Sequence, residues 1–318
     1  MRDHHISSAD RVPFVDAHVH HWDPSKPDWY PYLAPGADLP HLGLGDISGM
    51  KRYFGQGTLL SEARPWTIAA YVHVSAATAP GMHLRETDML VELAARTGSP
   101  SAIVGSVDPT EELVAIETEL DRQLESPLFR GVRIMDGLDY RSARATQILN
   151  LVAERGLVYD LHIQAKEMHA AARAVEQVSD LTVVVEHCGG PSRSDDPAGL
   201  KAWQQGISEL AERPNTSIKF SGLAMTLHRI SVDAFRPWFE HMASEFGPRR
   251  VLMGSNFPVD GLYGTLPNLL DTYLELARPL GTAAVAAMFA DTARHIYLSA
   301  AAPQEPSRVP PESLKGTP

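Results

Sequence analysis

The chain has 318 residues, of which 44% are hydrophobic and 21% charged. These values are typical of a globular protein that buries a large core without disulfides or a structural metal. Its formal net charge of -11 argues against a general binder of nucleic acid or anionic membranes, because the chain lacks a broad positive field. The single cysteine, Cys188, excludes an intrachain disulfide and favours a reducing compartment.

Targeting signals are not apparent in the sequence. Residues 1–11 are polar and contain no apolar signal segment. No run of apolar residues approaches the length of a membrane span. We therefore expect a cytoplasmic protein that binds neither nucleic acid nor membranes.

Short β-rich apolar runs alternate with longer stretches in which apolar residues recur at helical spacing. The predicted strands are 13–18, 67–74, 102–107, 129–134, 157–162, 182–187, 216–220 and 250–254. The predicted helices are 84–96, 111–125, 141–155, 167–178, 197–212, 232–245 and 266–278, with one further C-terminal helix at 281–300. This alternation predicts parallel strands joined by right-handed crossovers, and an α/β protein of the (β/α)8 TIM-barrel type is the simplest closed solution. An open doubly wound sheet is the alternative, but no glycine-rich phosphate loop follows the first strand.

The barrel is expected to form one domain over residues 1–300, followed by a flexible, proline-rich tail over 301–318. The first strand–helix connection, 20–66, is unusually long. Its aromatic residues, among them Trp22 and Trp29, favour an ordered loop over the barrel mouth that offers Trp22 to a substrate. A peripheral decoration is an equal alternative.

Histidines follow three of the predicted strands. His18 and His20 lie two residues apart on the first strand, so both point to the same side, where two imidazoles can chelate one divalent metal. His162 ends the fifth strand and His187 ends the sixth. Because all strand ends of a barrel converge on one mouth, we expect these four histidines to meet in space. His73 on the second strand is a weaker candidate for substrate contact, and a role in the core is as plausible.

Polar residues beside these histidines complete the candidate site. Arg133, near the end of the fourth strand, would hold a substrate carboxylate or polarise a carbonyl group. A salt bridge to Asp108, Asp136 or Glu186 is an equal alternative for Arg133. Gln164 shares the strand parity of His162 and is a candidate for substrate binding.

Six segments resemble the amidohydrolase-related family of fuconolactonases, sulfomuconolactone hydrolases and 2-pyrone-4,6-dicarboxylate lactonases. They are VDAHVHHWDP (15–24), FRGVRI (129–134), LHIQA (161–165), VVEHCGGP (184–191), IKFSGL (218–223) and RVLMGSNFPV (250–259). The resemblance implies an amidohydrolase-superfamily barrel that acts on lactones. It implies His18, His20 and His162 as ligands of one divalent metal, most plausibly zinc, and His187 as the residue that polarises the substrate or moves a proton. Some lactonases of this family work without a metal.

The last-strand motif departs from the family pattern. The family's usual Gly-Ser-Asp-Trp-Pro is replaced here by Gly-Ser-Asn256-Phe-Pro, and an amide cannot serve as a general base. The base is then His187, Asp260 or a metal-bound water, of which we favour His187. Asp260, four residues further on, is a candidate only if it reaches the mouth.

The leading interpretation is a hydrolase acting on a small lactone or related cyclic ester, with His187, Asn256 and Arg133 in the reaction centre. The first alternative is a decarboxylase, isomerase or hydratase of a small unsaturated acid, since a lyase or isomerase that does not activate water has no need of the missing carboxylate base. The second is a ligand-binding barrel without activity. The expected partner is a small molecule, carboxylate-bearing if Arg133 is free to bind it, and a homodimer is the commonest assembly for such proteins.

Overall fold

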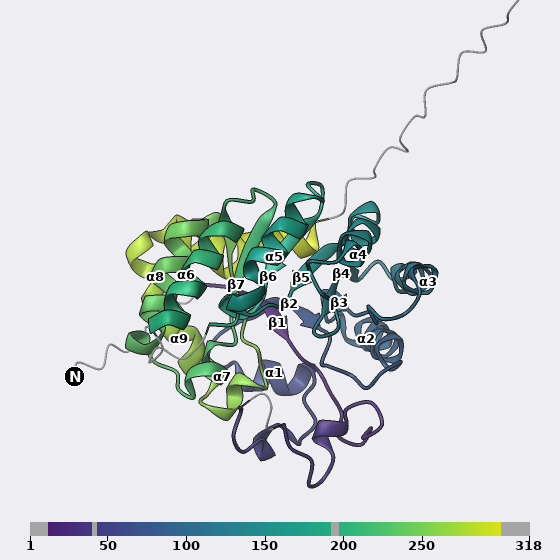
Figure 1. Ribbon diagram of the computed structural model, residues 1–318. Coiled ribbons are helices and arrows are strands. Elements are labelled where there is room, and N and C mark those ends of the chain that lie inside the picture. The colour runs from purple at the N-terminus through teal and green to yellow at the C-terminus, as the bar shows by residue number, and fades with distance from the viewer. Residues whose placement is uncertain (1–11, 40–42, 192–196, 300–318) are drawn as a thin grey trace, which may run out of the picture.

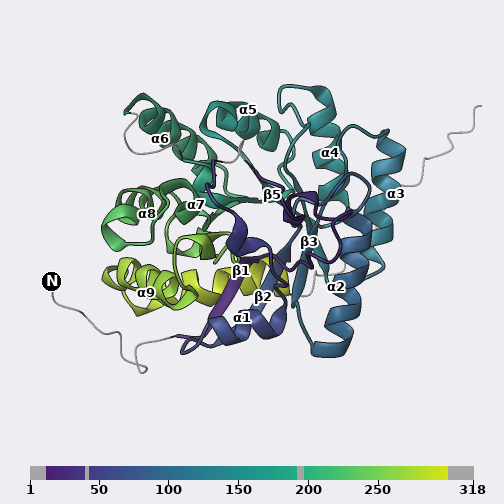
Figure 2. The same ribbon diagram turned by 90° about the horizontal axis from the view of Figure 1, so that it is seen from below.

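The computed structural model describes residues 12–39, 43–191 and 197–299, so the tail expected at 301–318 lies outside the described residues. Eight parallel strands form one sheet in sequential order, which confirms the predicted barrel topology (Figures 1 and 2). The strands are β1 (Phe14–Val19), β2 (Ile68–Val74), β3 (Ala102–Gly105), β4 (Phe129–Ile134), β5 (Val158–Leu161), β6 (Thr182–Val185), β7 (Thr216–Phe220) and β8 (Val251–Met253).

At the carboxyl end of the barrel, the residues that follow β8 form hydrogen bonds with the end of β1. The backbone N–H of Asn256 donates to the carbonyl of His18 at 2.8 Å, and that of His20 donates to Phe257 at 2.9 Å. The Asp16 carboxylate also accepts the N–H of Ser255 at 2.7 Å. These bonds bring the end of β8 beside the histidines of β1.

The helices surround the sheet, as Figure 2 shows in a view along the barrel. Those that cover it are α2 (His83–Thr97), α3 (Leu113–Leu124), α4 (Ala143–Glu154), α5 (Ala165–Glu176), α6 (Pro197–Ala211), α8 (Val232–Phe246) and α9 (Leu266–Ala277). Each corresponds to a predicted helix within a few residues. Serine or threonine caps begin three of them: Ser142 accepts the N–H of Ala145, Ser231 that of Ala234, and Thr265 that of Asn268.

The long connection between β1 and β2 gathers at one end of the barrel (Figure 1). Its described residues contain two 3-10 turns, Pro31–Leu33 and Ser48–Met50, and the short helix α1 (Gln56–Glu62). The indole of Trp22 donates to the carbonyls of Met50 and Arg52 at 3.1 and 3.2 Å. The described part of the connection is therefore an ordered loop, which is one of the two alternatives that the sequence left open. A further short helix, α7 (Leu223–Leu227), follows β7 and was not predicted.

The C-terminal segment differs from the single helix predicted at 281–300. It begins as α10 (Thr282–Ala286) and continues as two π-helical stretches, Ala287–Asp291 and Arg294–Leu298. It packs across the opposite end of the barrel, where the ring of Phe289 lies 5.8 Å from that of Phe14. Hydrophobic periodicity did not reveal the π-helical turns, because an α-helix would present much the same apolar residues. No helix within the described ranges is long and apolar enough to cross a bilayer.

Candidate active site

The two histidines of the first strand face each other. Nε2 of His18 lies 3.2 Å from Nε2 of His20, and both side chains are buried. Nδ1 of His20 lies 2.8 Å from the carbonyl of Val74, which can only accept, so Nδ1 carries the proton and Nε2 of His20 has a free lone pair. Burial lowers the pKa of both imidazoles well below the ordinary value, and nearby positive groups act in the same direction. Both rings are therefore neutral at pH 7.

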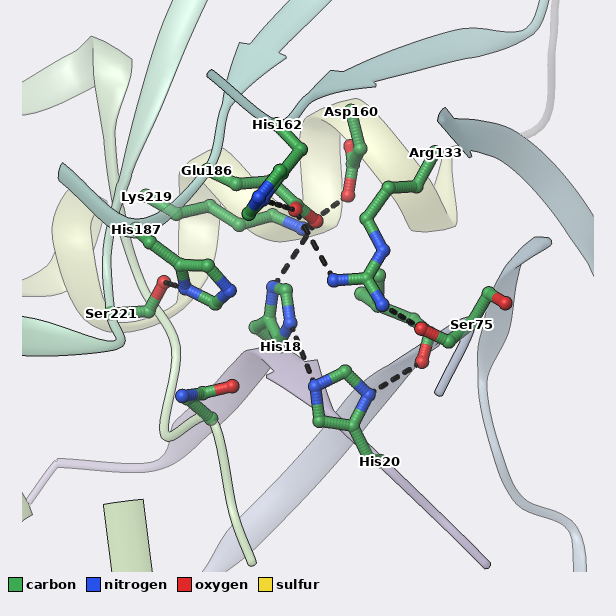
Figure 3. Close-up of polar contacts among 12 residues, drawn as sticks. His18, His20, Ser75, Arg133, Asp160, His162, Glu186, His187, Lys219 and Ser221 are labelled. Atoms are coloured by element: carbon green, nitrogen blue, oxygen red, sulfur yellow. Dashed lines mark hydrogen bonds and ion pairs between the residues drawn. The ribbon is translucent and has the colours of Figure 1, made fainter. Parts of the chain in front are cut away.

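Glu186, directly after β6, stands at the centre of the site (Figure 3). Its Oε1 lies 3.5 Å from Nδ1 of His18, and its Oε2 lies 3.5 Å from Nδ1 of His162. Burial alone would raise the pKa of this carboxyl, but Arg133 and the neighbouring His162 hold it below the ordinary value. Glu186 is thus an anion. It orients the His18 and His162 rings by facing Nδ1 of each.

Arg133 is engaged by the protein rather than open to a ligand. Its Nη1 lies 3.4 Å from Oε2 of Glu186, and its Nη2 donates to the carbonyl of Ser75. The side chain is only 3% exposed. The structure therefore shows the salt bridge to Glu186 that the sequence left as an alternative, and it does not support Arg133 as a clamp for a substrate carboxylate.

His187 begins a tight turn after β6, His187–Gly189. Its ring lies 4.5 Å from that of His18, centroid to centroid, and 6.1 Å from that of His162. Its Nδ1 lies 3.1 Å from Oγ of Ser221. Burial lowers the pKa of His187 to about 3, although Glu186 opposes this effect. His187 is therefore an uncharged imidazole beside the first-strand pair.

Asn256 and Asp260 form a pair after β8. Nδ2 of Asn256 donates to Oδ1 of Asp260 at 3.0 Å. Burial raises the pKa of Asp260 to about 7, and the hydrogen bond from Asn256 opposes this increase. Because Asp260 is fully buried, it contacts the site through its hydrogen bond with Asn256 and not directly.

Backbone strain is concentrated at the mouth of the barrel. Five non-glycine residues of the described chain have φ between 48° and 56°: Ala77, His187, Cys188, His228 and Asn256. Each lies in a connection that follows the carboxyl end of a strand. Such conformations cost about 1–3 kcal/mol each and tend to persist at functional sites. The distribution supports the mouth as the working end of the molecule.

The other candidate residues lie around this centre rather than in it. His73 is fully buried, with Nδ1 accepting the N–H of His21 at 3.1 Å and Nε2 3.7 Å from Glu86. The Trp22 ring stacks on that of His20 at 6.1 Å, and Trp22 is only 2% exposed. Gln164 is exposed at the start of α5. The geometry thus gives His73 and Trp22 a supporting position, and of these three only Gln164 is accessible.

Cys188 has no features of a nucleophile. It is fully buried, its Sγ lies 3.6 Å from the carbonyl of Ser221, and burial raises the pKa of its thiol well above the ordinary range. A Cys–His pair with His187 is accordingly not formed.

A buried ion pair beneath Glu186 was missed by the sequence analysis. The Lys219 ammonium on β7 binds the Asp160 carboxylate on β5, and the Tyr297 hydroxyl donates to the same carboxylate. Nζ of Lys219 lies 4.0 Å from Oε1 of Glu186. One signal was available: a lysine within the apolar run Ile218–Phe220 needs a buried anion if it points inward.

The residues present fit a divalent metal. Imidazole nitrogens bound to one tetrahedral Zn²⁺ at about 2.0–2.1 Å would lie roughly 3.3–3.4 Å apart, close to the 3.2 Å between Nε2 of His18 and His20. Nδ1 of His18 and Oε1 of Glu186 lie 3.5 Å apart and have no hydrogen-bond partner elsewhere, so Nε2 of His18 is the nitrogen left for an ion. Ligand atoms of His18, Glu186 and His187 lie within 4.8 Å of one another. The structure thus gathers this trio, whereas the predicted third ligand, His162, lies against Glu186.

The barrel and its buried histidines define a (β/α)8 protein with a metal-competent centre at the carboxyl ends of the strands. The family description "Amidohydrolase" matches residues 15–298, and the chain belongs to the amidohydrolase family. The same residues carry the resemblance found in the sequence.

Two curated proteins and two solved structures are similar to the chain over most of its length. The chain is 26% identical to the uncharacterized protein y4mH of Sinorhizobium fredii, over 90% of this chain and 98% of that protein. It is 26% identical to an L-fucono-1,5-lactonase of Burkholderia ambifaria, over 79% and 82%. A zinc-bound amidohydrolase of Burkholderia multivorans has a similar structure, with a TM-score of 0.76, 22% identity and coverage of 90% and 99%. A 5-carboxyvanillate decarboxylase of Sphingomonas paucimobilis shares the fold, with a TM-score of 0.60, 14% identity and coverage of 91% and 99%.

Proposed function

We propose that this protein hydrolyses a small lactone or related cyclic ester at the centre formed by His18, His20 and His187. The observation that carries the proposal is the pair of neutral imidazoles of His18 and His20, with Nε2 atoms 3.2 Å apart, next to a third neutral imidazole, His187. The lactonase relatives support the substrate class.

A divalent metal, zinc in the first instance, would be held by His18 and His20. The third ligand would come from His162, as the family resemblance implies, or from Glu186. When bound, such an ion polarises a carbonyl group and lowers the pKa of water. Glu186 fixes the His18 ring for this role, because it faces Nδ1 and leaves Nε2 turned toward His20.

His187 is the residue to which we assign proton transfer. If its Nδ1–H donates to Ser221, its Nε2 has a free lone pair and can accept a proton from the attacking water. The water oxygen forms a bond to the carbonyl carbon, the ring C–O bond breaks, and His187 returns the proton to the departing alkoxide. The product is a hydroxy acid, and no carboxylate base is required.

The charges of the centre favour a neutral substrate. Arg133 is paired with Glu186, and Lys219 with Asp160. These four charges cancel, and neither cation is free to bind a substrate carboxylate. An uncharged lactone therefore fits the protein's own groups better than a carboxylic acid does.

The experiment is turnover of a lactone panel by metal-loaded protein in oxygen-18 water, read by product mass. Hydrolysis adds one labelled oxygen and yields the mass of the hydroxy acid. His187→Ala is expected to lower turnover at least about 100-fold, the size of a typical general acid–base contribution. Unchanged turnover in His187→Ala would remove the role of this residue, and the absence of lactone turnover in the wild-type protein would reject the function.

The second candidate is a decarboxylase, favoured by one observation: Asn256 stands where a base that activates water is expected, and decarboxylation needs no such base. Small unsaturated carboxylic acids assayed in the same way separate the two reactions, because a decarboxylase releases carbon dioxide and leaves a product lighter than its substrate. A ligand-binding barrel would instead bind lactones without changing them.

A further inference from the structure

We propose that Asp260 is a positioning residue that fixes Asn256 with its amide oxygen toward the catalytic centre, so that the end of the eighth strand supplies an uncharged hydrogen-bond acceptor. The inference rests on the proposed function, since it assigns a role within the same centre. It also gives a purpose to an acidic residue that lies too deep to meet a substrate.

The contacts of the amide nitrogen determine its orientation. Nδ2 of Asn256 lies 3.0 Å from Oδ1 of Asp260 and 3.6 Å from Sδ of Met225. The thioether sulfur can only accept a hydrogen bond, and a carboxyl oxygen accepts one as well, so this side of the amide is the NH2 group. The oxygen, Oδ1, consequently points to the opposite side.

The oxygen of Asn256 remains open. Within the described parts of the chain, no group donates a hydrogen bond to it. The fully buried side-chain atoms without a partner include Oδ2 of Asp260 but not Oδ1 of Asn256. Although Asn256 is only 1% exposed, its oxygen is therefore the part that solvent can reach.

The backbone places Asn256 beside the first-strand histidines. Its N–H donates to the carbonyl of His18 at 2.8 Å, and its φ of 55° is left-handed. The N–H of Asp260 donates back to the carbonyl of Asn256 at 3.1 Å. The two residues are thus tied together by both backbone and side chain, and an open acceptor at this position suits a donor such as the attacking water.

Burial of Asp260 carries a cost that the proposed role explains. Its Oδ2 is buried without a hydrogen-bond partner, which costs free energy in any folded protein. A residue needed only to fill space would be better replaced by an apolar side chain. Among the described residues, Asn256 is the one side chain that donates a hydrogen bond to this carboxyl, and the backbone at Ala224 and Met225 also favours its ionised form.

The test compares Asp260→Leu, which removes the acceptor and keeps the branched shape of the side chain, with Asp260→Asn, which retains a carbonyl oxygen for Asn256. Selective nitrogen-15 labelling is practical because the chain has four asparagines, Asn150, Asn215, Asn256 and Asn268. The side-chain NH2 signal of Asn256 is identified by its loss in Asn256→Asp. We expect its hydrogen exchange to be at least about tenfold faster in Asp260→Leu than in the wild-type protein and in Asp260→Asn.

On the lactone that the wild-type protein turns over, Asp260→Leu should lower kcat about 10–100-fold with little change in KM, and Asp260→Asn should stay within a few-fold of wild type. An unchanged Asn256 signal in Asp260→Leu, or equal impairment of both variants, would overturn the proposal. If Asp260→Leu does not fold, Asp260→Ala takes its place with the same expectation. The NMR measurement needs no substrate, so its outcome is independent of whether any lactone is turned over.

Discussion

The hydroxyl of Tyr297 donates a hydrogen bond to Asp160, which joins the C-terminal segment to the floor of the candidate active site, across 137 positions of sequence. Asp160 also binds the Lys219 ammonium, whose Nζ lies 4.0 Å from Oε1 of Glu186. Asp160, Lys219 and Tyr297 are all fully buried. A buried ion pair is maintained only when its remaining hydrogen-bonding capacity is satisfied, and Tyr297 supplies part of that satisfaction from the far end of the barrel.

Replacement of Tyr297 by phenylalanine should therefore destabilise the protein. The variant keeps the aromatic ring in the core but removes a hydrogen bond to a charged group, for which a loss of about 1.5–3 kcal/mol is expected. Chemical denaturation monitored by circular dichroism measures the change.

Tyr140→Phe is the matched control, because the Tyr140 hydroxyl is also buried but pairs with another neutral hydroxyl, that of Tyr159, at 2.8 Å. Its expected loss is about 0.5–1.5 kcal/mol. Equal losses in the two variants would show that the charge on Asp160 adds nothing to the Tyr297 bond.

Replacement of Gly222 by alanine should disturb His187. Gly222 has a φ of 65°, and an added Cβ would lie 2.4 Å from Nδ1 of His187. The imidazole has to move, and displacement of a reacting group by about 1 Å can cost roughly 100-fold in turnover. Steady-state kinetics with the lactone substrate measures the effect.

Gly156→Ala is the control for backbone strain alone, since Gly156 has a φ of 62° and nothing lies within 4 Å of the added Cβ. Both variants should lose about 1 kcal/mol of stability from the left-handed conformation. Only Gly222→Ala should lose turnover, so a fully active Gly222→Ala protein would place His187 outside the reaction.

The sequence predicted the barrel because its signal is local and repeated. Alternating apolar runs fixed strands such as 129–134 and 216–220, both of which the structure reproduces as β4 and β7. It also predicted that His18, His162 and His187 would meet, because the carboxyl ends of barrel strands share one rim. Those inferences needed only the direction of the strands and the parity of residues along them.

Pairings between strands were harder to predict than positions along them. Arg133 had three acidic candidates as partners, and only the folded chain shows that Glu186 is the one in contact. Lys219 and Asp160 lie on β7 and β5, which are not neighbours in the sheet, so no local pattern joins them. Tyr297 reaches them through a segment whose π-helical turns leave no distinct periodicity.

Replacement of Glu186 by glutamine should weaken metal binding. The neutral amide no longer attracts Nδ1 of His18 and His162, each 3.5 Å from the native carboxylate, and loss of such a supporting carboxylate typically lowers metal affinity 10–100-fold. It also leaves Arg133 without its counter-ion, so a loss of stability is expected as well. Zinc affinity measured by competition with a chromophoric chelator tests the first expectation.

Glu119→Gln is the matched control, because Glu119 also contacts a histidine, His83, at 3.0 Å, but on the outer helices. This variant should bind zinc as the wild-type protein does. A wild-type affinity in Glu186→Gln would mean that the imidazoles are held by the fold without the help of the carboxylate.

The stability of the protein should depend on the protonation of Asp260 between about pH 4 and pH 7. Burial raises the pKa of Asp260 from 3.8 to about 7, so across this window the folded state binds more protons than the unfolded state, and the free energy of unfolding falls as pH rises. About three pKa units at roughly 1.4 kcal/mol each set an upper bound of about 4 kcal/mol on this change in the free energy of unfolding.

The Asp260→Asn variant lacks this contribution. Asp16, whose pKa burial also raises to about 7, is present in both proteins, so its contribution cancels in the comparison. Urea denaturation of both metal-free proteins from pH 4 to pH 8 should therefore show the variant gaining on the wild type as pH rises, and parallel curves would contradict a buried carboxyl that resists ionisation.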